Sequence, residues 1–88
     1  MKPRFTVVWS PSARKRLAEL WLDNPEIRQE ITDVANEFDA ALANQPTSIG
    51  IATPGRARLV TRPPLTALFL VFEEDRQVRV IYVKLWDE

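Results

Sequence analysis

The stretch from Arg56 to Trp86 constrains the fold of this chain more than any other part of it. It contains three runs of β-type residues, ARLVTRPP, LTALFLVF and VRVIYVKLW, and the last two are joined by the charged turn EEDRQ. Valine, leucine, isoleucine and aromatic residues fill these runs, and such side chains suit a pleated, half-buried surface. The middle run, Leu65 to Phe72, is nearly all apolar, which is typical of a central strand covered on both faces. The sequence therefore predicts an antiparallel meander that the preceding residues must cover.

The residues before this stretch predict one strand and two helices. Phe5 to Trp9 is an apolar run of strand length, and Ser10-Pro11 then supplies an N-cap and a proline suited to the first helical position. We expect the first helix to run to about Leu22. Asn24-Pro25 repeats the same signal, and the second helix should end near Ala43 or Asn44, just before Pro46. Its apolar positions recur at helical spacing and should face the sheet: Ile27, Ile31, Val34, Phe38 and Leu42.

The elements follow in the order β-α-α-β-β-β, which indicates an α+β fold in a single domain of residues 1–88. The sequence predicts a four-stranded, mainly antiparallel sheet with an N-terminal helical hairpin on one face and the other face open. The first strand must join at an edge, beside the second or the fourth strand, and the helical crossover permits parallel pairing with the fourth. The loop-like stretch QPTSIGIATPG, Gln45 to Gly55, either connects these parts or carries function.

Two missing residue types narrow the chemistry that the chain can perform. It has no cysteine, so no disulfide or thiolate metal site is available, and no histidine, the commonest general base and metal ligand. We therefore expect neither a metal site nor a cofactor. No apolar run reaches the length of a bilayer span and no signal peptide is evident in MKPRFTVVW. We expect a cytoplasmic protein that does not contact a membrane.

The charges balance in number but are segregated along the chain. Twelve basic and twelve acidic residues give a net charge of zero. Lys2 to Arg16 contains only basic charges, Glu19 to Asp39 is acidic apart from Arg28, and Arg56 to Arg62 is basic again. Two interpretations stay open: ordinary solvated surface charge, or a basic face for a polyanion with an acidic face elsewhere.

Three segments follow one another over nearly the whole chain: VVWSPSARKRLAELW, the P-x-x-x-G of Pro46 to Gly50, and RxLVTRPPLTALFLVFEEDRQVRVIYV. In this order they resemble the RelE/ParE toxin superfamily. The resemblance implies the fold derived above, and a toxin of a type II toxin–antitoxin module of the plasmid stabilisation type. Such a toxin is a cytoplasmic growth inhibitor that a cognate antitoxin neutralises by wrapping a segment over it.

The resemblance leaves the target open. ParE-like members inhibit DNA gyrase, whereas RelE-like members cleave mRNA on the ribosome; a third alternative is a non-toxic binding module that keeps the fold. RelE-like nucleases carry basic residues and a Tyr or His just after the last strand. This chain instead ends in KLWDE, and its one tyrosine, Tyr82, is mid-strand and expected in the core. We therefore prefer a ParE-like toxin that acts by binding, and leave enzymatic activity open.

The resemblance also implies site residues. It assigns Arg58 a phosphate-clamping role. Strand period places Arg62 on the same face and Lys84 is a third cation, so these three are the catalytic candidates. Arg56, Arg58 and Arg62 are the candidates for binding an anion or the target. We expect Arg58 and Arg62 to project from the open face, with Leu59 toward the helices; the alternative is pairing with the acidic turn at residues 73–75.

The open face and the end of the last strand at Trp86 lack an obvious intramolecular cover. The resemblance implies that an antitoxin binds there. Because this apolar surface is uncovered, we expect a hetero-complex with the antitoxin, or a homodimer when the antitoxin is absent.

Overall fold

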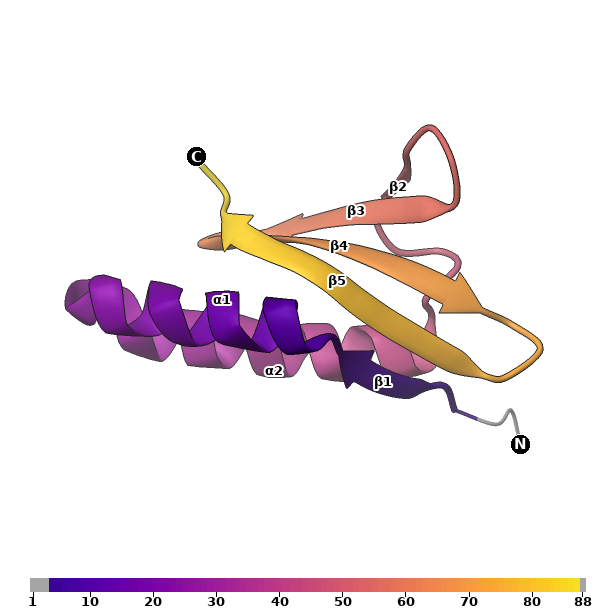
Figure 1. Cartoon of the computed structure of the whole chain (residues 1–88), viewed down its shortest axis with the longest axis horizontal. Coiled ribbons are helices and arrows are strands. Elements are labelled where there is room, and N and C mark those ends of the chain that lie inside the picture. The colour runs from indigo at the N-terminus through magenta and orange to yellow at the C-terminus, as the bar shows by residue number, and fades with distance from the viewer. Residues whose placement is uncertain (1–3, 88) are drawn as a thin grey trace.

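The computed structural model describes residues 4–87, so Lys2 and Glu88 of the charged segments lie outside the described residues. One strand comes first, two helices joined by a 3-10 turn come next, and the other strands follow (Figure 1). The elements in chain order are β1 (Thr6–Trp9), α1 (Pro11–Asp23), η1 (Pro25–Ile27), α2 (Arg28–Asn44), β2 (Ile51–Ala52), β3 (Ala57–Arg62), β4 (Leu65–Phe72) and β5 (Gln77–Leu85).

The strands form one mixed sheet in the order β1-β5-β4-β3-β2. The meander β3-β4-β5 is antiparallel, and β1 lies parallel to β5 at one edge, as the helical crossover permits. Both helices lie on one face of this sheet (Figure 1), which confirms the predicted α+β architecture. The predicted number of strands was wrong by one, because Ile51 and Ala52, within the loop-like stretch, pair with β3 as the short edge strand β2.

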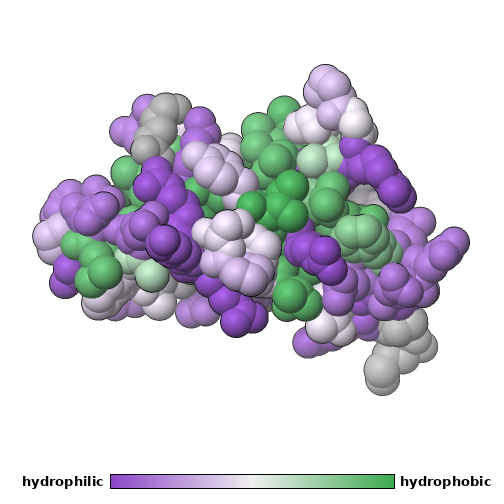
Figure 2. Space-filling view, in the orientation of Figure 1, coloured by the Kyte–Doolittle hydropathy of each residue, from purple (hydrophilic) through white to green (hydrophobic). Residues whose placement is uncertain are grey.

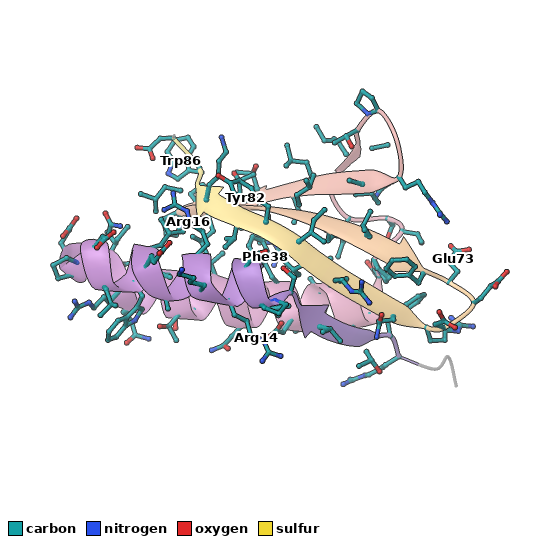
Figure 3. All side chains as sticks on the ribbon, in the orientation of Figure 1. Arg14, Arg16, Phe38, Glu73, Tyr82 and Trp86 are labelled. Atoms are coloured by element: carbon teal, nitrogen blue, oxygen red, sulfur yellow. The ribbon has the colours of Figure 1, made fainter. Side chains whose placement is uncertain are left out.

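The core lies between α2, α1 and the helix-facing side of the sheet. The predicted apolar stripe is buried there at Ile31, Val34, Phe38 and Leu42, whereas Ile27 lies in η1 and is half-buried. Phe38 is 1% exposed and points between the helices and the sheet (Figure 3). The fully buried strand residues that meet it are Leu65, Ala67, Phe69, Val78, Val80 and Val83. Burial of this stripe is the main stabilising contribution of α2, because a helix in a protein gains most of its stability from packing of its apolar face rather than from helix propensity.

The predicted start of the first helix is confirmed, and that of the second is wrong by a few residues. Ser10 caps α1 as predicted, since its Oγ accepts a hydrogen bond from the backbone N–H of Ala13 at 3.1 Å. The second start was placed too early: Pro25–Ile27 forms a 3-10 turn, and α2 begins at Arg28. Asn24 instead caps the C-terminal end of α1, where its side-chain amide donates a hydrogen bond to the backbone carbonyl of Leu20 at 2.8 Å.

A bulge in β5 decides which side chains leave the sheet on the side away from the helices. Phe69 pairs with Val80, but the preceding Leu68 pairs with Tyr82, so Ile81 is the extra residue. An extra residue inverts the alternation beyond it. Tyr82, expected in the core, is therefore 48% exposed.

The central strand was expected to be covered on both faces, and this was wrong. β4 is central, with β3 and β5 beside it. Leu65, Ala67 and Phe69 are buried beneath the helices, whereas Leu68 and Leu70 on the opposite side are only half-buried.

Candidate functional site

The face of the sheet away from the helices, which we call the open face, carries an apolar row that crosses four strands. Ile51 of β2 pairs with Leu59 of β3, Leu59 with Leu68 of β4, and Leu68 with Tyr82 of β5. Ile51 is 66% exposed, and Leu59 and Leu68 are half-buried. Large apolar side chains that share one exposed face indicate a binding surface rather than scattered surface residues. We call these four residues the cross-strand row.

Figure 2 shows hydrophobic side chains gathered over the strands, whereas the helices present mainly hydrophilic ones. Figure 3 shows Tyr82 and Trp86 on the side of β5 away from the helices, and Arg14 on the side of α1 away from the sheet. In this view the strands therefore carry the more apolar part of the visible surface.

The rows on either side of the cross-strand row carry cations. On one side, Leu70 pairs with Arg79. On the other, Thr66 pairs with Lys84, and the hydroxyls of Thr61 and Thr66 share a hydrogen bond of 2.9 Å. The cross-strand row is therefore flanked by a guanidinium on one side and an ammonium on the other.

Arg79 is held in place by two neighbours on the open face. Its guanidinium lies over the ring of Phe72, 5.4 Å from the ring centroid, and its Nη2 donates to Oε1 of Gln77 at 3.3 Å. Phe72 and Gln77 are themselves paired across β4 and β5. A guanidinium stacked on a ring keeps most of its N–H donors for an incoming acceptor, at a reduced entropic cost.

Arg58 and Arg62 share a strand face as predicted, but the expectation that they leave from the open face was wrong. Val60 between them is the buried residue of β3, 6% exposed, so both arginines lie on the helix side and Leu59 on the open face. Arg62 Nη1 lies 3.6 Å from Oε2 of Glu37 on α2. The acidic partner is on a helix rather than in the turn between β4 and β5.

Arg58 makes hydrogen bonds to the backbone of the segment that leads into β2. Its Nε donates to the carbonyl oxygen of Ile49 at 3.1 Å, and its Nη2 donates to that of Gly50 at 3.2 Å. Gly50 has φ of 74°, and a Cβ added there would overlap the backbone carbonyl of Leu59. The segment Pro46 to Gly50, whose Pro46 is fully buried, is therefore held against β3 at Ile49 and Gly50, directly before Ile51 of the cross-strand row. We call it the strap.

The remaining predicted site residues are dispersed. Arg56 is exposed ahead of β3, beside a shallow surface depression that it lines together with Glu73, Glu74 and Asp75 of the β4–β5 turn. Trp86 is 52% exposed, and its backbone N–H donates to the carbonyl of Pro64 at 2.9 Å. The structure does not bring Arg56 and Lys84 together with Arg58 and Arg62, and the roles assigned to these residues stay predictions.

Sequence reasoning missed Ile51 and Arg79 as members of the site. Ile51 was assigned to a loop, and a two-residue strand leaves no periodic pattern to detect. The alternation in QVRVIYVK could have placed Arg79 on the face opposite Val78 and Val80, although the bulge at Ile81 prevents the same inference for Tyr82.

The open face is chemically suited to binding. Its polar groups are hydroxyls, an amide and cations, and within residues 4–87 no three acidic side chains cluster as metal ligands would. No helix in the described part of the chain is long and apolar enough to cross a membrane.

Two solved structures share this architecture. A chain of the toxin–antitoxin complex RelBE2 from Mycobacterium tuberculosis matches with a TM-score of 0.80 and 19% sequence identity, over 100% of this chain and 98% of that one. A chain of the chromosomal ParDE TA system from P. aeruginosa matches with a TM-score of 0.76 and 14% identity, over 92% of this chain and 95% of that one. A scan against protein-family models and a search of curated proteins gave no match. At these identities the likeness concerns the fold, and the chain has the RelE/ParE toxin fold that its sequence predicts.

Proposed function

We propose that this chain is the toxin of a type II toxin–antitoxin module, a cytoplasmic growth inhibitor that a cognate antitoxin neutralises by covering the open face. The observation that carries the proposal is the nearly full-length likeness to chains from two complexes that are both toxin–antitoxin assemblies. Fold alone does not establish function, so the site must support it independently. The exposed cross-strand row does so, because an apolar surface of this kind is suited to a protein partner.

Inhibition by binding, with DNA gyrase as the target as in ParE-like toxins, is the preferred mode of action. The chain has no histidine or cysteine, so the commonest general base and the most reactive nucleophile are missing. The open face presents mainly Ile51, Leu59 and Leu68, aliphatic side chains that suit a protein surface better than an RNA.

The exposure of Tyr82 favours a second candidate, ribosome-dependent mRNA cleavage as in RelE-like toxins. Its hydroxyl lies on the same face as Arg79 and Lys84, so a proton-transferring group and two cations share one surface. Such an arrangement suits general acid–base chemistry at a phosphate.

Inducible expression in bacteria tests the proposal. We expect growth arrest on induction of the chain alone, and normal growth when the product of the neighbouring reading frame is co-expressed. Growth at the uninduced rate without the second protein would instead identify a non-toxic binding module. Purified toxin should inhibit gyrase supercoiling; if it instead cleaves mRNA on ribosomes, and the variant Tyr82→Phe loses this activity, the second candidate is correct.

The same surface accounts for the expected homodimer. With the antitoxin absent, two open faces can cover one another, and the antitoxin then competes with self-association. Sedimentation at increasing concentration should reveal a dimer that the antitoxin converts to a hetero-complex.

A further inference from the structure

The acidic residues of this chain are excluded from its sheet. Of the described residues, every Asp and Glu lies in a helix, in the 3-10 turn, in the β4–β5 turn or after β5, and none lies in β1 to β5. The strands contain only basic charges: Arg58, Arg62, Arg79 and Lys84. The only charges on the strands of the open face are therefore cations, and the acidic residues nearest to them are those of the β4–β5 turn, which line a surface depression together with Phe72 and Arg56.

Arg79 is the cation on this face whose contacts leave it ready for a partner. The two groups that hold its guanidinium, the ring of Phe72 and the side-chain amide of Gln77, are uncharged, and the residue is exposed. A carboxylate binds such a planar guanidinium with two parallel hydrogen bonds. The bond strengthens when an apolar partner excludes water from around it.

We propose that the open face recognises one amphipathic segment of the antitoxin, with apolar side chains along the cross-strand row and a carboxylate placed beside them on Arg79. This inference rests on the proposed function, because it takes the antitoxin as the occupant. It specifies the chemistry of that segment, and charge complementarity selects an acidic one.

The dimensions of the row indicate the length of the segment. Four strands spaced about 4.8 Å apart give a row roughly 14 Å long, which about nine or ten residues of an α-helix span. Successive residues on one strand face are about 6.6 Å apart, so Arg79 lies one row away from the apolar centre. An acidic residue three or four positions from an apolar anchor on a helix meets this spacing, since such side chains are about 5–6 Å apart.

A single-stranded nucleic acid fits the same surface less well. Its affinity depends on several cations along the backbone and on aromatic rings that stack with bases. The cross-strand row offers three aliphatic side chains and one ring, with one cation on either side.

The test is calorimetric titration of the folded chain with the antitoxin, comparing Arg79→Gln with the control Arg14→Gln. Arg14 is exposed on α1, on the far side of the molecule, so the control removes the same charge elsewhere (Figure 3). We expect Arg79→Gln to weaken binding by about 10- to 100-fold, the range for a hydrogen-bonded charged group, and Arg14→Gln by less than about twofold. Leu68→Ala should also weaken binding. Thermal melts should show that all variants are folded.

The dependence on salt gives a second, independent readout. Raising the ionic strength should weaken binding of the parent chain more steeply than binding of Arg79→Gln, because the variant has lost the ion pair.

If Arg79→Gln binds the antitoxin as tightly as Arg14→Gln does, the proposed carboxylate contact is wrong, while the toxin assignment stands. If the antitoxin binds with no effect of Leu68→Ala either, the open face is not the site. If no second protein binds or relieves toxicity, the proposed function itself fails. Binding of a single-stranded oligonucleotide that depends on Arg79 and resists the antitoxin would overturn the inference in favour of a nucleic acid.

Discussion

The substitution Gly50→Ala should destabilise this protein for two separable reasons. The first is backbone strain: Gly50 has φ of 74°, where an L-residue with a side chain costs about 1–2 kcal/mol. The second is overlap, because the new Cβ would meet the carbonyl of Leu59 and force the strap away from β3. Moving the strap weakens the two hydrogen bonds from Arg58 to Ile49 and Gly50, which together contribute about 1–3 kcal/mol because one is part-buried and the other is exposed. Together with the strain, we expect a total loss of about 2–5 kcal/mol, a large share of the stability of a small domain.

Gly55→Ala provides the matched control. Gly55 also has positive φ, 94°, but a Cβ added there would meet no atom within 4 Å. Its substitution should therefore cost only the backbone strain, about 1–2 kcal/mol. The difference between the two variants isolates the close approach of the strap to β3.

Urea denaturation followed by circular dichroism measures both losses, and the slopes of the unfolding free energy against urea should agree between variants. Equal losses for Gly50→Ala and Gly55→Ala, to within about 0.5 kcal/mol, would refute the reasoning, because the strap would then not be packed against β3. A folded Gly50→Ala protein should also bind the antitoxin more weakly than Gly55→Ala does, since Ile51 directly follows Gly50.

Two further predictions concern the core and the arginines of β3. Phe38→Ala should lower the free energy of unfolding by about 3–5 kcal/mol, because the ring is fully buried. The control Leu22→Ala, at an exposed position, should lower it by less than about 0.5 kcal/mol. A loss below about 1 kcal/mol for Phe38→Ala in urea denaturation would mean that the stripe does not face the core. Arg58→Ala should lower stability by about 1–3 kcal/mol by releasing the strap, and Arg62→Ala by less than about 1 kcal/mol, because its ion pair with Glu37 is exposed. Loss of toxicity in both variants, with melting temperatures unchanged, would instead support the predicted anion-binding role.

The sequence alone determined the two helices, the strands other than β2 and the antiparallel meander, because the signals for them are local. Ser10-Pro11 begins α1 with a cap and a proline, and the stripe centred on Phe38 requires an apolar surface to cover it. Three β-type runs with short links permit little except a meander, and the helical crossover then brings β1 parallel to an outer strand. Each of these inferences needs only neighbouring residues and the periods of helix and strand.

The tertiary structure decided which side chains reach the open face. The alternation along ARLVTR is equally compatible with Leu59 or Val60 pointing inward, and only packing beneath α2 selects Val60, which turns Arg58 and Arg62 toward the helices. The bulge at Ile81 has no local signal, yet it inverts the strand and exposes Tyr82. The alternation of side chains along a strand is a property of the backbone. Which of the two strand faces is buried depends on contacts with residues distant in the chain, and the buried face determines which side chains form the binding surface.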